Sequence, residues 1–182
     1  WKEFLPQMEY DQTKVSQLLS LREEKRNKYF DHIGNELENI QKEVLNPEIY
    51  REKLVALLPL NSETILDAGC GTGQFVPYLL SRAKNVIGVD SSSKMIEIAG
   101  KNFARNKNVS FQVSSLETLP LKDESVDAVV ASMVLHHISN PPLVLKEFQR
   151  ILKPEGTICI VDLEKHDEEF MRNNYADLWL GF

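Results

Sequence analysis

The sequence predicts an α/β protein with an open parallel sheet, preceded by a helical segment. From Thr64 onward, short apolar runs alternate with stretches of helical spacing, a pattern typical of β-α-β units and therefore of parallel strands. Before residue 60 the chain is rich in Glu, Lys, Gln and Leu and contains a single glycine, Gly34, as expected for helices. We therefore divide the chain into a helical segment, 1–46, and an α/β domain, 47–182.

The helical segment contains two amphipathic stretches. The first covers about residues 11–30 and has one side formed by Val15, Leu18, Leu19 and Arg22. The second has an apolar face formed by Ile33, Leu37, Ile40, Val44 and Leu45. Such a face needs a partner surface, so we expect this segment to be a lid over a binding site, a linker or a homodimer surface. A further helix starts at Asn46 and Pro47, because Asn can cap free backbone amides and Pro fits the first helical turn.

The α/β domain has five expected strands, at residues 64–68, 86–89, 109–113, 126–131 and 157–161. Helices are expected between them at about 74–82, after a cap at Ser91 or Ser92, and from Pro141 to Leu152. The segment 153–156 is expected to be a turn before the fifth strand.

Composition excludes several classes of protein. The apolar runs are much shorter than the roughly 20 residues of a membrane span. The net charge is −6, and neither the helical segment nor the remainder has an excess of Lys and Arg, so we expect no nucleic-acid binding by this chain. Two cysteines, Cys70 and Cys159, form neither a disulfide framework nor a zinc motif, which makes the cytoplasm the simplest compartment.

The strongest chemical signal is the segment ILDAGCGTG at residues 65–73. A strand that turns into a helix through Gly69, Gly71 and Gly73 lets the backbone approach a ligand closely, because no Cβ intrudes. The spacing differs from the dinucleotide fingerprint G-x-G-x-x-G and lacks the Lys-Ser/Thr ending of a P-loop. The alternative is a glycine-rich turn without a ligand.

Asp90 ends the second expected strand, 17 residues beyond Gly73. A carboxylate at that position can accept hydrogen bonds from both hydroxyls of a ribose. By itself it could instead be an acidic residue that stabilises the start of a helix. The glycine loop one β-α-β unit earlier favours the ribose interpretation.

Four motifs in order resemble the class I S-adenosylmethionine-dependent methyltransferases: residues 65–73, 86–99, 116–138 and 152–162. The resemblance covers about residues 50–182. It implies a Rossmann-like sheet, S-adenosylmethionine as cofactor, S-adenosylhomocysteine as product, and methyl transfer to a small-molecule acceptor. The family fold has seven strands, so we expect this chain to lack the C-terminal hairpin and its fifth strand to be an exposed edge or to be covered by another chain.

The resemblance also assigns residues to the cofactor. The glycine loop would pass under the methionine part, Asp67 would orient the loop and the cofactor's amino group, and Asp90 would hold the ribose. Relatives have an acidic residue after the third strand that accepts a hydrogen bond from the adenine amino group. This chain has Ser114 and Ser115 there, so Ser115 Oγ or the Leu116 amide would make the contact instead. The alternative is that both serines are loop residues without a ligand contact. The apolar pair beside adenine, Met95 and Leu116, could equally be core. The expected cofactor contacts are Asp67, Gly69, Gly71, Gly73, Asp90, Ser91, Met95, Ser115 and Leu116.

His136 and His137 follow the fourth expected strand, at the sheet edge where ligands bind. One imidazole could line the acceptor pocket or take a proton from the nucleophile, since an unperturbed pKa of about 6.5 suits a general base. Alternatively, one histidine caps a loop and the other is exposed. No metal site is predicted, because the acidic run at 164–169 is typical of a solvated surface. The two cysteines are expected to pack rather than to form the thiolate site of an arsenite methyltransferase.

A narrower resemblance involves residues 21–40, 125–156 and 166–182. These segments are similar to the methyltransferase-like module that is fused behind an ArsR-type winged-helix repressor domain. This resemblance leaves a second function open, a module that senses S-adenosylmethionine or S-adenosylhomocysteine for a transcriptional regulator without turnover.

Overall fold

The computed structural model describes residues 5–44 and 46–182, without the side chains of residues 5–9, 16, 35, 38, 41, 43 and 44. Five parallel strands form one sheet in the order β3-β2-β1-β4-β5. Their bounds are Ser62–Ala68 for β1, Ala83–Asp90 for β2, Val109–Val113 for β3, Val126–Ser132 for β4 and Leu152–Val161 for β5. The predicted fold class and the five strands are confirmed, and β5 is an edge strand that pairs with β4 alone among the described residues.

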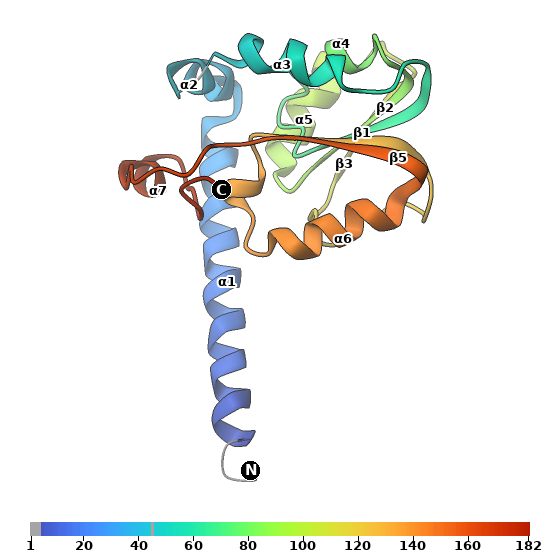
Figure 1. Cartoon of the computed structure of the whole chain (residues 1–182). Coiled ribbons are helices and arrows are strands. Elements are labelled where there is room, and N and C mark those ends of the chain that lie inside the picture. The colour runs from blue at the N-terminus through green and yellow to red at the C-terminus, as the bar shows by residue number, and fades with distance from the viewer. Residues whose placement is uncertain (1–4, 45) are drawn as a thin grey trace.

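The described residues form seven α-helices besides this sheet, and α7 comes after its last strand (Figure 1). They are α1 (Leu5–Ile33), α2 (Leu37–Val44), α3 (Pro47–Ala56), α4 (Val76–Leu79), α5 (Ser93–Asn102), α6 (Pro141–Ile151) and α7 (Phe170–Asn174). Two short 3-10 helices are η1 (Gly34–Glu36) and η2 (Leu135–His137). Within the described residues, no helix is both long enough and apolar enough to cross a membrane.

The core has two layers, one on each face of the sheet. Alternate residues of β1 point to opposite layers, so that Leu66 and Ala68 pack in one and Ile65 in the other. The first layer is completed by α6 through Val144 and Phe148. The second is completed by α3 and α4, through Leu54, Val55, Val76 and Leu79.

Two elements differ from the sequence-based expectation. The helix expected at 74–82 is much shorter, because Pro77 has no N–H and is tolerated only in the first turn of a helix. The expected turn at 153–156 lies inside β5 as an irregularity: Val126 pairs with Leu152, whereas Ala128 pairs with Thr157. The strand therefore begins before the turn and resumes after it.

The helical segment also differs from one continuous amphipathic face. Gly34 has φ +33°, and the chain changes from α1 through η1 to α2 at this point. Ile33, Leu37 and Ile40 line a pocket of this chain, while Leu45 lies outside the described residues. The N-terminal half of α1 extends away from the sheet (Figure 1), with Val15 and Leu18 exposed.

Gly100 offers a simple test of the description of α5. It lies within that helix on the exposed side, and an added Cβ would meet no atom within 4 Å. Gly100→Ala is expected to raise the free energy of unfolding by about 0.5–1 kcal/mol, because alanine loses less backbone entropy on folding. Chemical denaturation measures this change. A lower stability would contradict the placement of Gly100 on the open side of α5.

Candidate functional site

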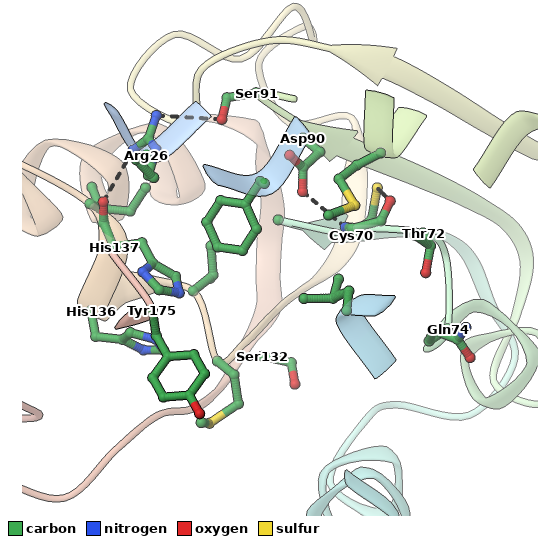
Figure 2. Close-up of a pocket in the computed structure, with 18 of the residues that line it drawn as sticks. Arg26, Cys70, Thr72, Gln74, Asp90, Ser91, Ser132, His136, His137 and Tyr175 are labelled. Carbon is green, nitrogen blue, oxygen red and sulfur yellow. Dashed lines mark hydrogen bonds between the residues drawn. The ribbon is translucent and has the colours of Figure 1, made fainter. Parts of the chain in front are cut away.

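The main pocket lies where the strand order reverses. The chain runs from β1 outward to β3 and then returns to β4 on the other side of β1. In open parallel sheets, ligands bind at such a reversal, outside the carboxyl ends of the strands. Here the pocket is lined by the loops after β1, β2 and β4, by α1 and α2, and by the C-terminal segment (Figure 2).

The glycine loop after β1 is held against β2 by backbone hydrogen bonds. The Gly69 and Cys70 amides donate to the Val89 carbonyl at 2.8 and 3.1 Å, and the Gly71 amide donates to Asp90 Oδ2 at 2.9 Å. Gly69 and Gly71 both have positive φ, +73° and +51°, a region that favours glycine. The loop therefore lines the pocket with backbone, and the space in front of the two glycines is taken by the side chains of Val134 and Leu37.

Asp67 lies at the end of β1, beneath this loop. Its side chain is 2% exposed, and Oδ2 has no hydrogen-bond partner among the described residues. Burial raises the pKa of Asp67 to about 7, with the Arg51 guanidinium opposing the effect. A buried carboxylate oxygen without a partner, next to the backbone of the glycine loop, can accept a hydrogen bond from the charged amino group of S-adenosylmethionine.

The raised pKa of Asp67 predicts a pH-dependent affinity for S-adenosylmethionine. Below about pH 7 the free protein carries a proton on Asp67, which must leave before the carboxylate can pair with a cationic amino group. Affinity is therefore expected to increase roughly five- to tenfold from pH 6 to pH 7.5. Calorimetry across this range measures the change. Asp67→Asn should flatten the profile, and an equal slope in that variant would assign it to another group.

Asp90 faces the pocket from the end of β2 (Figure 2). Oδ1 accepts the Ser92 amide and Oδ2 accepts the Gly71 amide, each at 2.9 Å. Each carboxylate oxygen keeps a further lone pair for a ribose hydroxyl. Burial raises the pKa of Asp90, while the two amide hydrogen bonds oppose that rise.

Helix α1 forms a wall of the pocket through a buried arginine. Arg26 is 7% exposed and donates to the His137 carbonyl at 3.1 Å and to Ser91 Oγ at 3.4 Å (Figure 2). Phe30, one turn later, packs edge-on against the His137 ring at 4.9 Å between centroids. The helix therefore joins the loop after β2 to the loop after β4.

Both histidines expected to be catalytic line the pocket, and neither is exposed. His136 Nδ1 lies 2.6 Å from Asp162 Oδ1, which leaves Nε2 as the free ring nitrogen. Burial holds the pKa of His137 well below its usual range, so this imidazole is neutral. The alternative in which one histidine is a surface residue is wrong.

The remaining expected cofactor residues fall into two groups. Ser91, Met95 and Leu116 line the pocket, and the latter two are also buried in the core, so their contact with adenine stays a prediction. Gly73 and Ser115 are not among the lining residues. A Cβ at Gly73 would meet Phe103 and Phe111, which gives that glycine a packing role. Ser115 hydrogen-bonds to Glu117, and Glu117 is the acidic residue that lines the pocket after β3.

Two lining residues have no signal in the sequence. Arg26 lies 111 residues before His137, and no motif connects them. Asp177 belongs to the C-terminal segment, which is attached by the Leu178 and Trp179 amides that donate to the His136 carbonyl at 2.9 and 3.0 Å. Both residues enter the site through tertiary packing alone.

Comparison with known proteins agrees with this geometry. The family described as "Methyltransferase domain" matches residues 66–160. A demethylmenaquinone methyltransferase of Thermotoga maritima is 38% identical over 117 residues, which are 63% of this chain and 50% of that protein. A malonyl-[acyl-carrier protein] O-methyltransferase of Marinomonas sp. is 34% identical over 121 residues, 65% of this chain and 45% of that protein.

A solved structure is also similar to this chain in fold. The S-adenosylmethionine-dependent methyltransferase from Aquifex aeolicus has a TM-score of 0.60 and 26% identity, over 72% of this chain and 76% of that chain. This chain spans about half the length of the curated relatives described above. The matched family covers more than half of this chain, including the glycine loop and Asp90. The chain therefore belongs to the class I S-adenosylmethionine-dependent methyltransferase family.

Proposed function

We propose that this chain binds S-adenosylmethionine and catalyses the transfer of its methyl group to a nucleophile on a small-molecule acceptor. One observation carries the proposal. The glycine loop, the unpartnered Asp67 oxygen and Asp90 border one crevice, and His136 and His137 line it as well. The cofactor, S-adenosylmethionine, follows from membership of the family. The proposal adds that the methyl acceptor is a small molecule.

Each part of the cofactor has a residue that could hold it. Gly69 and Gly71 would support the methionine part, Asp67 would accept from its amino group, and Asp90 would accept from the ribose. Leu116 and Met95 would flank the adenine, and Glu117 offers an acceptor at that end of the pocket. When bound, S-adenosylmethionine supplies a methyl group on an already positive sulfur. The protein then contributes mainly by holding the acceptor about 3–3.5 Å away and in line.

The acceptor would lie against η2, α1 and the C-terminal segment. Phe30, Tyr29 and Tyr175 give this side an aromatic surface that excludes water. His136 and His137 both reach it, in line with the expectation that one of them takes the acceptor's proton. The contacts of Arg26 and Phe30 favour the lid among the roles expected for segment 1–46, and dimerisation through α1 remains a prediction.

Two parallel measurements test the proposal. Calorimetry with S-adenosylmethionine and S-adenosylhomocysteine measures binding, and a screen with radiolabelled methyl donor measures transfer to candidate acceptors. We expect binding of both ligands and transfer to at least one small molecule. Tight binding without transfer would instead favour the sensor module of an ArsR-type regulator. Absence of binding by correctly folded protein would contradict both functions.

A further inference from the structure

Asp177 is an unusual carboxylate in the pocket wall. Its side chain is fully buried, and neither carboxylate oxygen has a hydrogen-bond partner among the described residues. A buried polar group without a partner costs about 1–3 kcal/mol, and a charged group costs more. The position therefore indicates a ligand that Asp177 binds.

Ring nitrogens of two histidines lie close to Asp177 Oδ1. Oδ1 lies 3.5 Å from His137 Nδ1 and 3.8 Å from His136 Nε2. One ligand atom from each of the three residues lies within 4.8 Å of the other two. Three donor atoms from two segments of the chain therefore converge on one point.

The separations discriminate between possible occupants of that point. They exceed the roughly 2.7–3.2 Å of a direct hydrogen bond. Two groups bridged by a water or an ammonium at about 2.8 Å, with near-tetrahedral angles, would be about 4.5 Å apart. Two ligands on one metal ion at about 2.0–2.2 Å would be about 3.3–3.6 Å apart. The observed distances of 3.5 and 3.8 Å are nearest to the last arrangement.

The surroundings of His136 match those of a metal ligand. Asp162 Oδ1 lies 2.6 Å from His136 Nδ1 and also accepts the Leu163 amide, while Asp162 Oδ2 accepts the Leu135 amide. A histidine that binds a metal usually gives its other ring N–H to a carboxylate, which fixes its tautomer and orientation. With Asp162 at Nδ1, His136 Nε2 is the ring nitrogen available to a metal ion, and it lies 3.8 Å from Asp177 Oδ1.

His137 and the local charges are compatible with a cation. The Ala176 carbonyl lies 3.3 Å from His137 Nδ1 and can accept a hydrogen bond from Nδ1–H when no cation is bound. With a cation at Nδ1, the proton would move to Nε2 and the carbonyl would offer a further oxygen donor. Asp162 and Asp177 place two carboxylates beside these rings, while Arg26 donates to the His137 carbonyl and Arg172 acts on Asp177 from the C-terminal segment.

We propose that His136 Nε2, His137 Nδ1 and an Asp177 carboxylate oxygen bind one divalent first-row transition-metal ion. Two neutral imidazoles and one carboxylate suit zinc and its neighbours better than magnesium or calcium. The sequence predicted no metal site at the acidic run 164–169, and Asp177, which stands 40 residues after His137 in the chain, was not a candidate residue.

The ion would lie in the pocket wall on the acceptor side. As a Lewis acid there, it would lower the pKa of an acceptor hydroxyl, in place of direct proton removal by a histidine. This role rests on the proposed function, whereas the binding of the ion does not.

Cobalt(II) is the first probe, because its visible absorption reports coordination by protein ligands without any activity assay. The metal-free protein, residues 1–182, is titrated with Co²⁺. Its affinity for Zn²⁺ is measured by calorimetry in the absence of S-adenosylmethionine. We expect one ion per chain with visible bands. Asp177→Asn, which keeps the shape of the side chain, should weaken binding at least tenfold. Asp162→Asn should weaken it by about 10- to 100-fold through loss of ligand orientation.

His32→Gln is the matched control. His32 is an exposed histidine of α1 that does not line the pocket, so its loss should leave the affinity and the bands unchanged. Circular dichroism confirms that each variant is folded. Absence of a stoichiometric ion, or equal affinity in Asp177→Asn, would overturn the site. Binding of S-adenosylmethionine by metal-free protein would then still support the proposed function, so the two failures are distinguishable.

Discussion

Replacing Asp90 by alanine is expected to weaken the binding of S-adenosylmethionine by roughly 10- to 150-fold. A hydrogen bond to a charged group contributes about 1.5–3 kcal/mol, which corresponds to that range of affinity. The same substitution removes the acceptor for the Gly71 amide, so that the glycine loop loses its side-chain attachment to β2. Calorimetry on the folded variant measures the loss. An unchanged affinity would remove Asp90 from the site.

Asp127→Ala separates loss of binding from loss of structure. Asp127 also accepts a backbone amide from a neighbouring strand, Thr64 N–H at 2.8 Å, and it pairs with Lys153 Nζ at 2.8 Å. It lies near the start of β4. The pocket lies at the other ends of the strands, where they finish. We expect a lower free energy of unfolding, by about 1.5–3 kcal/mol, with an affinity within twofold of the unchanged protein.

The fold was predictable because its strands are specified locally. Runs such as Val126–Ser132 are apolar on both faces, as required for strands covered by helices on both sides. The helix caps were also predictable from local sequence. The side chains of Asn46 and Ser92 accept hydrogen bonds from the backbone amides of Glu48 and Met95. The expected helix at 74–82 was too long, because Pro77 fits only the first turn of α4, which starts at Val76.

The site was predictable only where its residues end a strand. Asp67, Gly69 and Asp90 follow directly from β1 and β2, and parallel strands bring their carboxyl ends to one edge. Arg26 and Asp177 could not be predicted, because their positions depend on how α1 and the C-terminal segment pack over that edge. Those two segments would form the acceptor side in the proposed function, which is why the cofactor follows from the sequence and the acceptor does not.

Gly69→Ala is expected to destabilise the protein by about 2–5 kcal/mol and to abolish measurable binding of S-adenosylmethionine. Gly69 has φ +73°, where a residue with a Cβ costs about 1–2 kcal/mol. The added Cβ would also lie 2.9 Å from Val134 Cβ and closer still to Cγ2, an overpacking that costs roughly 1–3 kcal/mol. Chemical denaturation gives the first quantity and calorimetry the second.

The two costs of Gly69→Ala are separable in a double-mutant cycle. In a Val134→Ala background the overlap disappears but the positive φ remains, so Gly69→Ala should cost about 1–3 kcal/mol less there than in the parent chain. Gly100→Ala is the matched control, since it adds the same Cβ in open space and is expected to stabilise. If Gly69→Ala cost the same in both backgrounds, Val134 would not determine how closely the loop after β4 approaches the glycine loop, and the packing described for this crevice would be wrong.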